Sequence, residues 1–88
     1  MKIKEGYILR EIAGSFVVVP VGDNVVDLSS MITINETGAF LWGFLEKGAD
    51  EDSLCAALMS EYEGAPEDEM RNDIREFISV LKEKDILE

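Results

Sequence analysis

Met31-Ile-Thr-Ile-Asn-Glu-Thr-Gly-Ala-Phe-Leu-Trp42 is the stretch that decides the fold, because the period of its apolar residues changes in the middle. Met31 to Ile34 alternate as the residues of a short strand do, whereas the apolar residues after Asn35 recur about every 3.6 positions, as in a helix. Asn35 suits the start of that helix because its side-chain oxygen can accept a hydrogen bond from an amide of the first turn. The stretch predicts a strand that runs directly into a capped helix.

The residues before Met31 predict further strands. Residues 7–12 and 16–21 are rich in β-branched residues, and Ala13-Gly14-Ser15 between them suits a hairpin connection. Pro20 has no amide hydrogen, so we expect that end of the second strand to lie at an edge or a bulge. After a turn at residues 22–24, residues 25–28 can extend the sheet.

The residues after Asn35 predict three helices. The first ends at a glycine cap, Gly48, and the second runs from near Asp50 to Gly64. Pro66 suits the first position of a third helix, and the acidic residues that follow it suit the positive end of the helix dipole. The chain is thus expected to form strands in its first third and helices in the rest.

Each predicted helix has an apolar face directed at the core. The expected core residues are Phe40, Leu41, Phe44 and Leu45 in the first helix, Leu54, Ala57, Leu58 and Tyr62 in the second, and Met70, Ile74, Phe77, Ile78 and Leu81 in the third. We expect Ile86 and Leu87 to fold back onto this core. Trp42 lies off the line of Phe40 and Phe44, and the pattern leaves open whether it is buried or exposed.

Three strands followed by three helices are typical of an α+β fold. We expect a three-stranded antiparallel sheet followed by a three-helix bundle, in a winged helix-turn-helix-like arrangement, with residues 1–88 forming a single domain. The longest run without polar side chains, residues 38–45, is too short to cross a bilayer. No secretion signal is visible at the start, so the expected location is cytoplasmic.

The residue types that usually carry catalysis are scarce. The sequence contains no His, which removes the commonest general base and the commonest metal ligand. The single cysteine, Cys55, has Leu54 and Ala56 as neighbours and is expected to be an inert core residue. The acidic runs 50–52 and 67–69 fall where helices begin and lack the spacing of a calcium loop. We therefore expect no catalytic residue, no metal and no cofactor.

The charge of the chain is strongly acidic. Nineteen acidic and eight basic residues give a formal net charge of −11, which repels nucleic acids and anionic membranes. Arg71, Arg75 and Lys82 nevertheless fall within a narrow arc beside the core face of the third helix. This arc, the basic rail, predicts either a surface for an acidic peptide or a solvated face with pairs such as Glu67 with Arg71.

The segment Ile34-Asn-Glu-Thr-Gly-Ala-Phe-Leu-Trp42 resembles the LNxTGxxIW segment of PqqD-like proteins. The Gly14 hairpin, the strand with Pro20 and the order of the later helices are similar as well. The resemblance implies a non-catalytic peptide chaperone that binds the leader peptide of a ribosomally synthesised precursor. It also implies presentation of that peptide to a modifying enzyme, often a radical SAM enzyme.

The resemblance further implies where the leader binds. In this family the leader adds as an antiparallel strand to the edge of the third strand, in the cleft beside the third helix. The site residues expected on this chain are Met31, Ile32, Thr33 and Ile34 at the strand edge, Ile74 and Ile78 as an apolar wall, and Arg71, Arg75 and Lys82 as the basic rail.

Other readings of the sequence stay open. A structural or adaptor subunit would dock a folded partner through the same edge strand, and the sequence does not distinguish that partner from a leader. A winged-helix DNA-binding regulator is less favoured, because the second helix, residues 50–63, contains no Lys or Arg. An exposed strand edge allows either a monomer or an edge-paired homodimer. The precursor, the modification and the enzyme are not specified.

Overall fold

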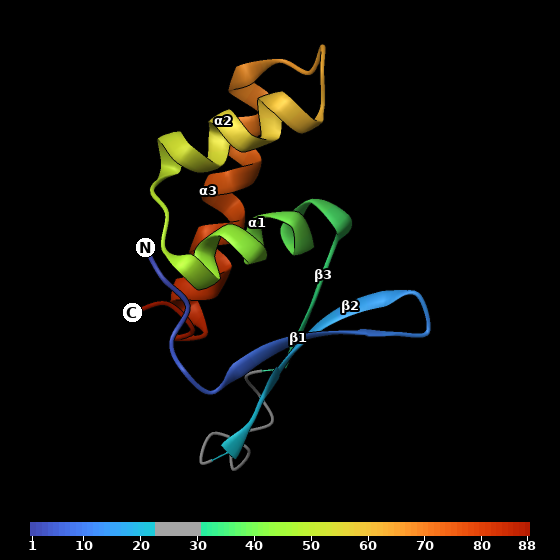
Figure 1. The fold of residues 1–88 in the computed structure, drawn as a ribbon, viewed down its shortest axis with the longest axis vertical. Coiled ribbons are helices and arrows are strands. Elements are labelled where there is room, and N and C mark those ends of the chain that lie inside the picture. The colour runs from blue at the N-terminus through green and yellow to red at the C-terminus, as the bar shows by residue number, and fades with distance from the viewer. Residues whose placement is uncertain (23–30) are drawn as a thin grey trace.

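The computed structural model describes residues 1–22 and 31–88 and contains a sheet and three helices (Figure 1). The strands are β1 (Tyr7–Ile12), β2 (Ser15–Pro20) and β3 (Ile32–Ile34), and the helices are α1 (Glu36–Lys47), α2 (Glu51–Glu61) and α3 (Glu67–Glu83). The predicted α+β fold and the order of its elements are confirmed. The predicted extension of the sheet at residues 25–28 falls outside the described residues.

The sheet is antiparallel, with the strand order β1-β2-β3. The β1–β2 register runs from Tyr7 opposite Pro20 to Ile12 opposite Ser15. In the described residues the β2–β3 pairing stops where Val18 faces Ile32, so Pro20 lies beyond this pairing. This agrees with the position expected for a residue without an amide hydrogen.

The turn between β1 and β2 consists of Ala13 and Gly14, because Ile12 already pairs with Ser15. Their φ angles are 51° and 83°, as a two-residue type I′ hairpin requires. Glycine adopts this conformation freely, whereas the Cβ of Ala13 approaches the backbone too closely in it. The predicted hairpin is confirmed, with Ser15 in the strand and not in the turn.

We predict that Ala13→Asn stabilises the protein by about 0.5–1 kcal/mol, because asparagine tolerates positive φ better than alanine does. Ala13→Val should act in the opposite direction, since a β-branched residue fits this conformation worst. The free energies of unfolding come from urea denaturation of the three proteins. Equal stabilities would contradict a strained turn at this position.

Side-chain caps fix the starts of two helices. The Oδ1 atom of Asn35 accepts a hydrogen bond from the Gly38 amide at 2.8 Å, and Oδ1 of Asp50 accepts one from the Ser53 amide at 2.7 Å. Gly48 ends α1 with a φ of 101°. These caps were predicted, whereas Pro66 precedes α3 by one residue and does not occupy its first position.

The core lies where the three helices meet the inner face of the sheet. Its buried residues include Val18 and Ile34 from the sheet, Leu41, Trp42 and Leu45 from α1, Leu54, Cys55 and Leu58 from α2, and Met70, Ile74, Ile78 and Leu81 from α3. Trp42 is 1% exposed, which settles its position as a core residue. Cys55 is buried, as predicted.

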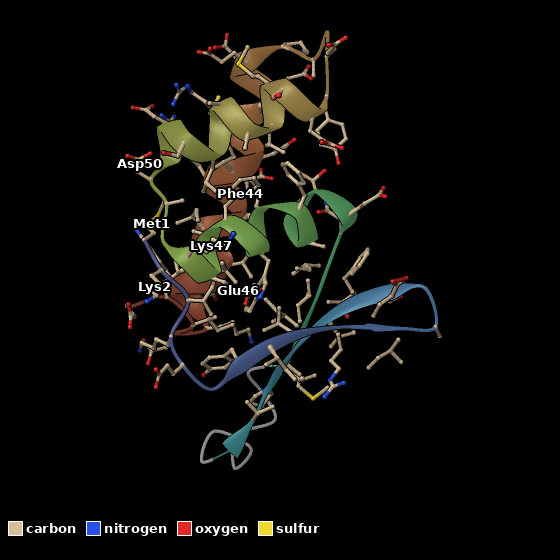
Figure 2. The ribbon with its side chains drawn as sticks, in the orientation of Figure 1. Met1, Lys2, Phe44, Glu46, Lys47 and Asp50 are labelled. Carbon is tan, nitrogen blue, oxygen red and sulfur yellow. The ribbon has the colours of Figure 1, made fainter. Side chains whose placement is uncertain are left out.

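The predicted burial of Phe44 and Tyr62 is wrong, because their exposed fractions are 40% and 38%. α1 directs Leu41, Trp42 and Leu45 inward, which leaves Phe44 on the outer side of the helix (Figure 2). Phe40 is half-buried between these regions, with its ring 5.2 Å from that of Phe44 and 6.3 Å from that of Tyr62. The three rings thus form a contact at the surface of α1 and the end of α2.

Both termini of the described chain are held against the helices. The Met1 amino group donates to the Ala49 carbonyl at 2.8 Å, which places Met1 at the connection between α1 and α2 (Figure 2). The Lys4 amide donates to the Ile86 carbonyl at 2.8 Å. Ile86 is fully buried and Leu87 is buried, so the predicted return of the C-terminus onto the core is confirmed.

Candidate functional site

A groove lies between β3 and α3, and the start of α1 closes its end. Its volume is about 270 Å³. The lining residues are Thr33, Ile34, Asn35, Thr37, Gly38 and Leu41 on one side and Asp73, Glu76, Phe77 and Val80 on the other. Buried or half-buried apolar side chains form its inner part, and the two carboxylates belong to exposed residues of α3. The groove is thus apolar inside and acidic along α3.

All the α3 residues that line the groove lie on one face of the helix. Asp73, Glu76, Phe77 and Val80 stand at positions i, i+3, i+4 and i+7, which share one face of an α-helix. The neighbouring face holds the core residues Met70, Ile74, Ile78 and Leu81. Because Phe77 lies between the two faces, its ring is half-buried and contributes to both.

Gly38 allows the three elements around the groove to approach each other. A Cβ atom at this position would lie 3.2 Å from Cε1 of Phe77, 3.3 Å from Oδ1 of Asn35 and 3.3 Å from Cβ of Ile34. These three atoms come from α3, the cap of α1 and β3. The glycine therefore sets how closely β3 and α1 pack against α3 at the base of the groove.

Gly38→Ala and Gly43→Ala form a matched pair within α1. An alanine in place of a helical glycine normally stabilises a protein by about 0.5–1 kcal/mol. We predict this gain for Gly43→Ala, because no atom lies within 4 Å of the new Cβ. Gly38→Ala should gain less or lose stability, because Phe77 and Ile34 must move. Urea denaturation measures both changes, and an equal gain at the two positions would contradict the close packing.

The outer edge of β3 opens beside the groove. Within the described residues β3 pairs only with β2, so alternate residues of β3 direct their backbone N–H and C=O groups away from the sheet. A second hollow shares Thr33, Ile34 and Asn35 with the groove and continues to Glu11 and Glu36. Two hollows therefore meet at Thr33 and Ile34 of β3.

The expected site residues on the strand lie at this edge. Thr33 and Ile34 line the groove directly, and Ile32 pairs with Val18 in β2. Met31 is 43% exposed and precedes β3, which begins one residue later than predicted. The structure thus brings the strand part of the expected site together.

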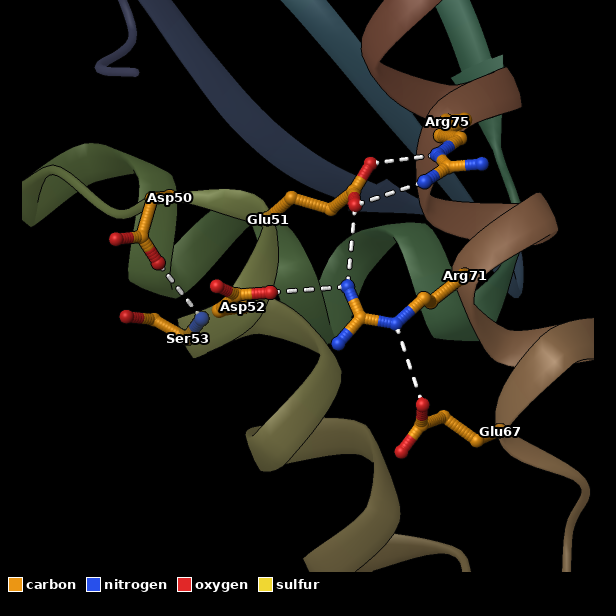
Figure 3. A network of polar contacts seen from close by, with 7 residues as sticks. All are labelled: Asp50, Glu51, Asp52, Ser53, Glu67, Arg71 and Arg75. Atoms are coloured by element: carbon orange, nitrogen blue, oxygen red, sulfur yellow. Dashed lines mark hydrogen bonds and ion pairs between the residues drawn. The ribbon is translucent and has the colours of Figure 1, made fainter.

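The basic rail does not line the groove between β3 and α3, because Arg71 and Arg75 face α2 (Figure 3). Nη1 of Arg71 lies 3.1 Å from Oε2 of Glu51 and 3.0 Å from Oδ1 of Asp52. Nε of Arg75 lies 2.7 Å from Oε1 of Glu51. The predicted Arg71–Glu67 pair is confirmed at 3.4 Å.

The expected apolar wall and Lys82 also lie away from the groove. Ile74 is 0% exposed and Ile78 is 8% exposed, so both belong to the core. Lys82, Ile78 and Arg75 line a separate hollow together with Met1. None of Ile74, Ile78 and Lys82 therefore lines the groove between β3 and α3.

The arginines and carboxylates perturb each other's protonation. The hydrogen bond from Arg75 lowers the pKa of Glu51 below its ordinary value of 4.5, and the hydrogen bond from the Ser53 amide lowers that of Asp50. The hydrogen bond to Asp52 raises the pKa of Arg71, and that to Glu51 raises the pKa of Arg75. All of these groups are therefore charged at neutral pH, and they join the start of α2 to α3.

We predict a pH-dependent contribution of Glu51 to stability. Because the folded-state pKa lies below 4.5, this contribution is fully present above pH 4.5 and is lost as the pH falls through the folded-state pKa. Wild type should melt at a higher temperature than Glu51→Gln near neutral pH, and the difference should shrink in acid. Thermal melts from neutral pH to pH 2.5 measure it. A difference that is constant with pH would contradict the account.

The sequence interpretation missed the α3 side of the groove. The sequence analysis assigned Phe77 to the core and did not place Asp73, Glu76 or Val80 at the site. The available signal was the i, i+3, i+4, i+7 spacing of these four residues. It describes a second, narrower face beside the more apolar core face.

Comparisons with known proteins agree with this architecture. The family model described as Coenzyme PQQ synthesis protein D (PqqD) matches residues 7–87. The chain belongs to the PqqD family. A solved structure titled "TbiB1 in Complex with the TbiA(beta) Leader Peptide" is similar with a TM-score of 0.75 and 23% identity, over 100% of this chain and 95% of that chain. This likeness shows a shared fold. A search of curated proteins gave no match.

Two further findings concern the described residues as a whole. None of the helices in residues 1–22 and 31–88 is long and apolar enough to cross a membrane. In the same part of the chain, no three His, Cys, Asp or Glu side chains converge as a metal site would require. The expectation of no metal and no cofactor stays a prediction.

Proposed function

We propose that the groove between β3 and α3 binds the leader peptide of a ribosomally synthesised precursor and presents it to a modifying enzyme without itself catalysing a reaction. The observation that carries the proposal is an edge strand that opens directly into an apolar groove. Membership of the PqqD family supports it. So does the shared fold with TbiB1, whose structure was solved with a leader peptide.

The leader would bind as a further antiparallel strand. Its backbone would exchange hydrogen bonds with residues 31–34, which gives affinity that depends little on the leader sequence. Side chains of an added strand alternate between two faces, so every second leader residue would enter the groove. There it would meet Phe77 and Val80, in place of the wall expected at Ile74 and Ile78.

The arginine cluster would serve this function indirectly. Arg71 and Arg75 join α3 to Glu51 of α2, on the flank of α3 that faces away from the groove. By holding α2, they would keep the helix that forms the groove wall in place. A leader held in this groove would raise the effective concentration of the rest of the precursor at a bound enzyme. We propose a radical SAM enzyme as that partner.

Leader peptides with N-methylated backbones test strand addition directly. The probe is the fluorescein-labelled leader segment of a short precursor encoded next to the gene of this protein, and fluorescence anisotropy measures its Kd. Methylation of every second amide gives two peptides, one methylated on the amides that would face β3 and one methylated on the amides that would face away. In the first peptide, each lost hydrogen bond should weaken binding roughly two- to twelvefold. The second peptide should bind like the unmodified leader.

The two methylated peptides control for each other, because they carry the same number of methyl groups. Equal binding by both peptides would contradict strand addition while leaving leader binding intact. Absence of binding by the unmodified leader would contradict leader recognition and favour a structural subunit that docks a folded partner through β3.

A further inference from the structure

We propose that the groove selects leader segments in which an apolar side chain is accompanied by a lysine or arginine two positions away. The inference rests on the proposed leader binding and names the chemistry of the bound segment. It reverses the sequence-based expectation of an acidic peptide, because the basic rail lies on the other flank of α3.

The charged residues that line the groove and the two hollows next to it are all acidic. Asp73 and Glu76 line the groove itself, and Glu11 and Glu36 line the hollow beside β3. A third hollow continues along α3 at Asp68, Glu69, Asn72 and Asp73. None of the residues that line these three hollows is Lys or Arg. Residues 23–30, whose structure is not described, contain two aspartates and no basic residue in sequence.

The nearest basic residues of α3 are held away from these carboxylates. Arg75 donates to both carboxylate oxygens of Glu51, at 2.7 and 3.2 Å. Arg71 is shared among Glu51, Asp52 and Glu67. With their own partners on α2 and the first turn of α3, these arginines leave Asp73 and Glu76 to a cation from outside the chain.

The spacing of the groove residues along α3 matches that of every second side chain in a bound peptide strand. Asp73 and Phe77 are four residues apart on α3, which corresponds to a rise of about 6 Å. Alternate residues of a strand that point to the same side are about 6.6–6.8 Å apart. Residues of both β3 and α3 line the same groove, so a strand added to β3 would pass beside the helix. An apolar residue over Phe77 and Val80 would place the residue two positions away near Asp73.

The net charge of −11 requires a control, because it attracts any cationic peptide. Asp73→Asn/Glu76→Gln removes two charges at the groove. Glu46→Gln/Glu63→Gln removes two charges from exposed residues that line none of the three hollows. Both double variants have the same net charge, so a difference between their peptide affinities depends on where the removed carboxylates lie.

A displayed random peptide library selected against the wild-type protein tests the proposal, with amide NMR used to retain peptides that shift Thr33–Leu41 and Asp73–Val80. We expect Lys or Arg two positions from an apolar residue. Asp73→Lys/Glu76→Lys should select Asp or Glu at the same position. The neutral groove variant should weaken the selected wild-type peptides roughly two- to fivefold per carboxylate, whereas the control variant should bind them like wild type.

Two outcomes would overturn the proposal and are distinguishable. Groove-binding peptides without a basic preference, or equal affinities for the two neutral double variants, would refute the charge selection and leave leader binding in place. If no selected peptide shifted the groove residues, the proposed leader-binding function would fail as well.

Discussion

The approach of β3 to α3 at Gly38 is the contact on which the candidate site depends. A side chain at this position would meet Phe77, Ile34 and Asn35 at 3.2–3.3 Å, so only glycine lets strand, cap and helix converge without displacement. Asn35 caps α1 directly after the end of β3, so a single residue joins the strand to the helix. The width of the groove follows from these local contacts.

The core face of α3 divides the remaining surface of this helix into two flanks with different tasks. One flank holds Arg71 and Arg75 against Glu51 and gives α2 a fixed position. The other flank faces β3 with Phe77, Val80 and two carboxylates that have no basic neighbour among the groove residues. A single helix thus connects the helical half of the molecule to the groove, and the buried face of α3 separates its basic flank from its acidic flank.

The sequence predicted the elements well because their signals are local. Asn35, Asp50 and Gly48 cap helices through their own backbone neighbours, and the hairpin follows from two turn residues. The expected α3 residues do not line the groove, because both flanks of α3 adjoin the core, and which flank faces the groove depends on where α2 and β3 pack. Glu51, distant in sequence, engages the arginines. The same lack of tertiary information misplaced Phe44 and left Trp42 undecided.

Intermolecular NOEs between the bound leader and the labelled protein test the central claim most directly. The account predicts cross-strand backbone NOEs from the leader to residues 32–34 in an antiparallel register, together with side-chain NOEs to Phe77 and Val80. NOEs from a tightly bound leader to Arg75, Ser79 and Lys82 instead, with none to β3, would contradict it. In that case the peptide would occupy the opposite flank of α3, and the groove would not be the recognition site.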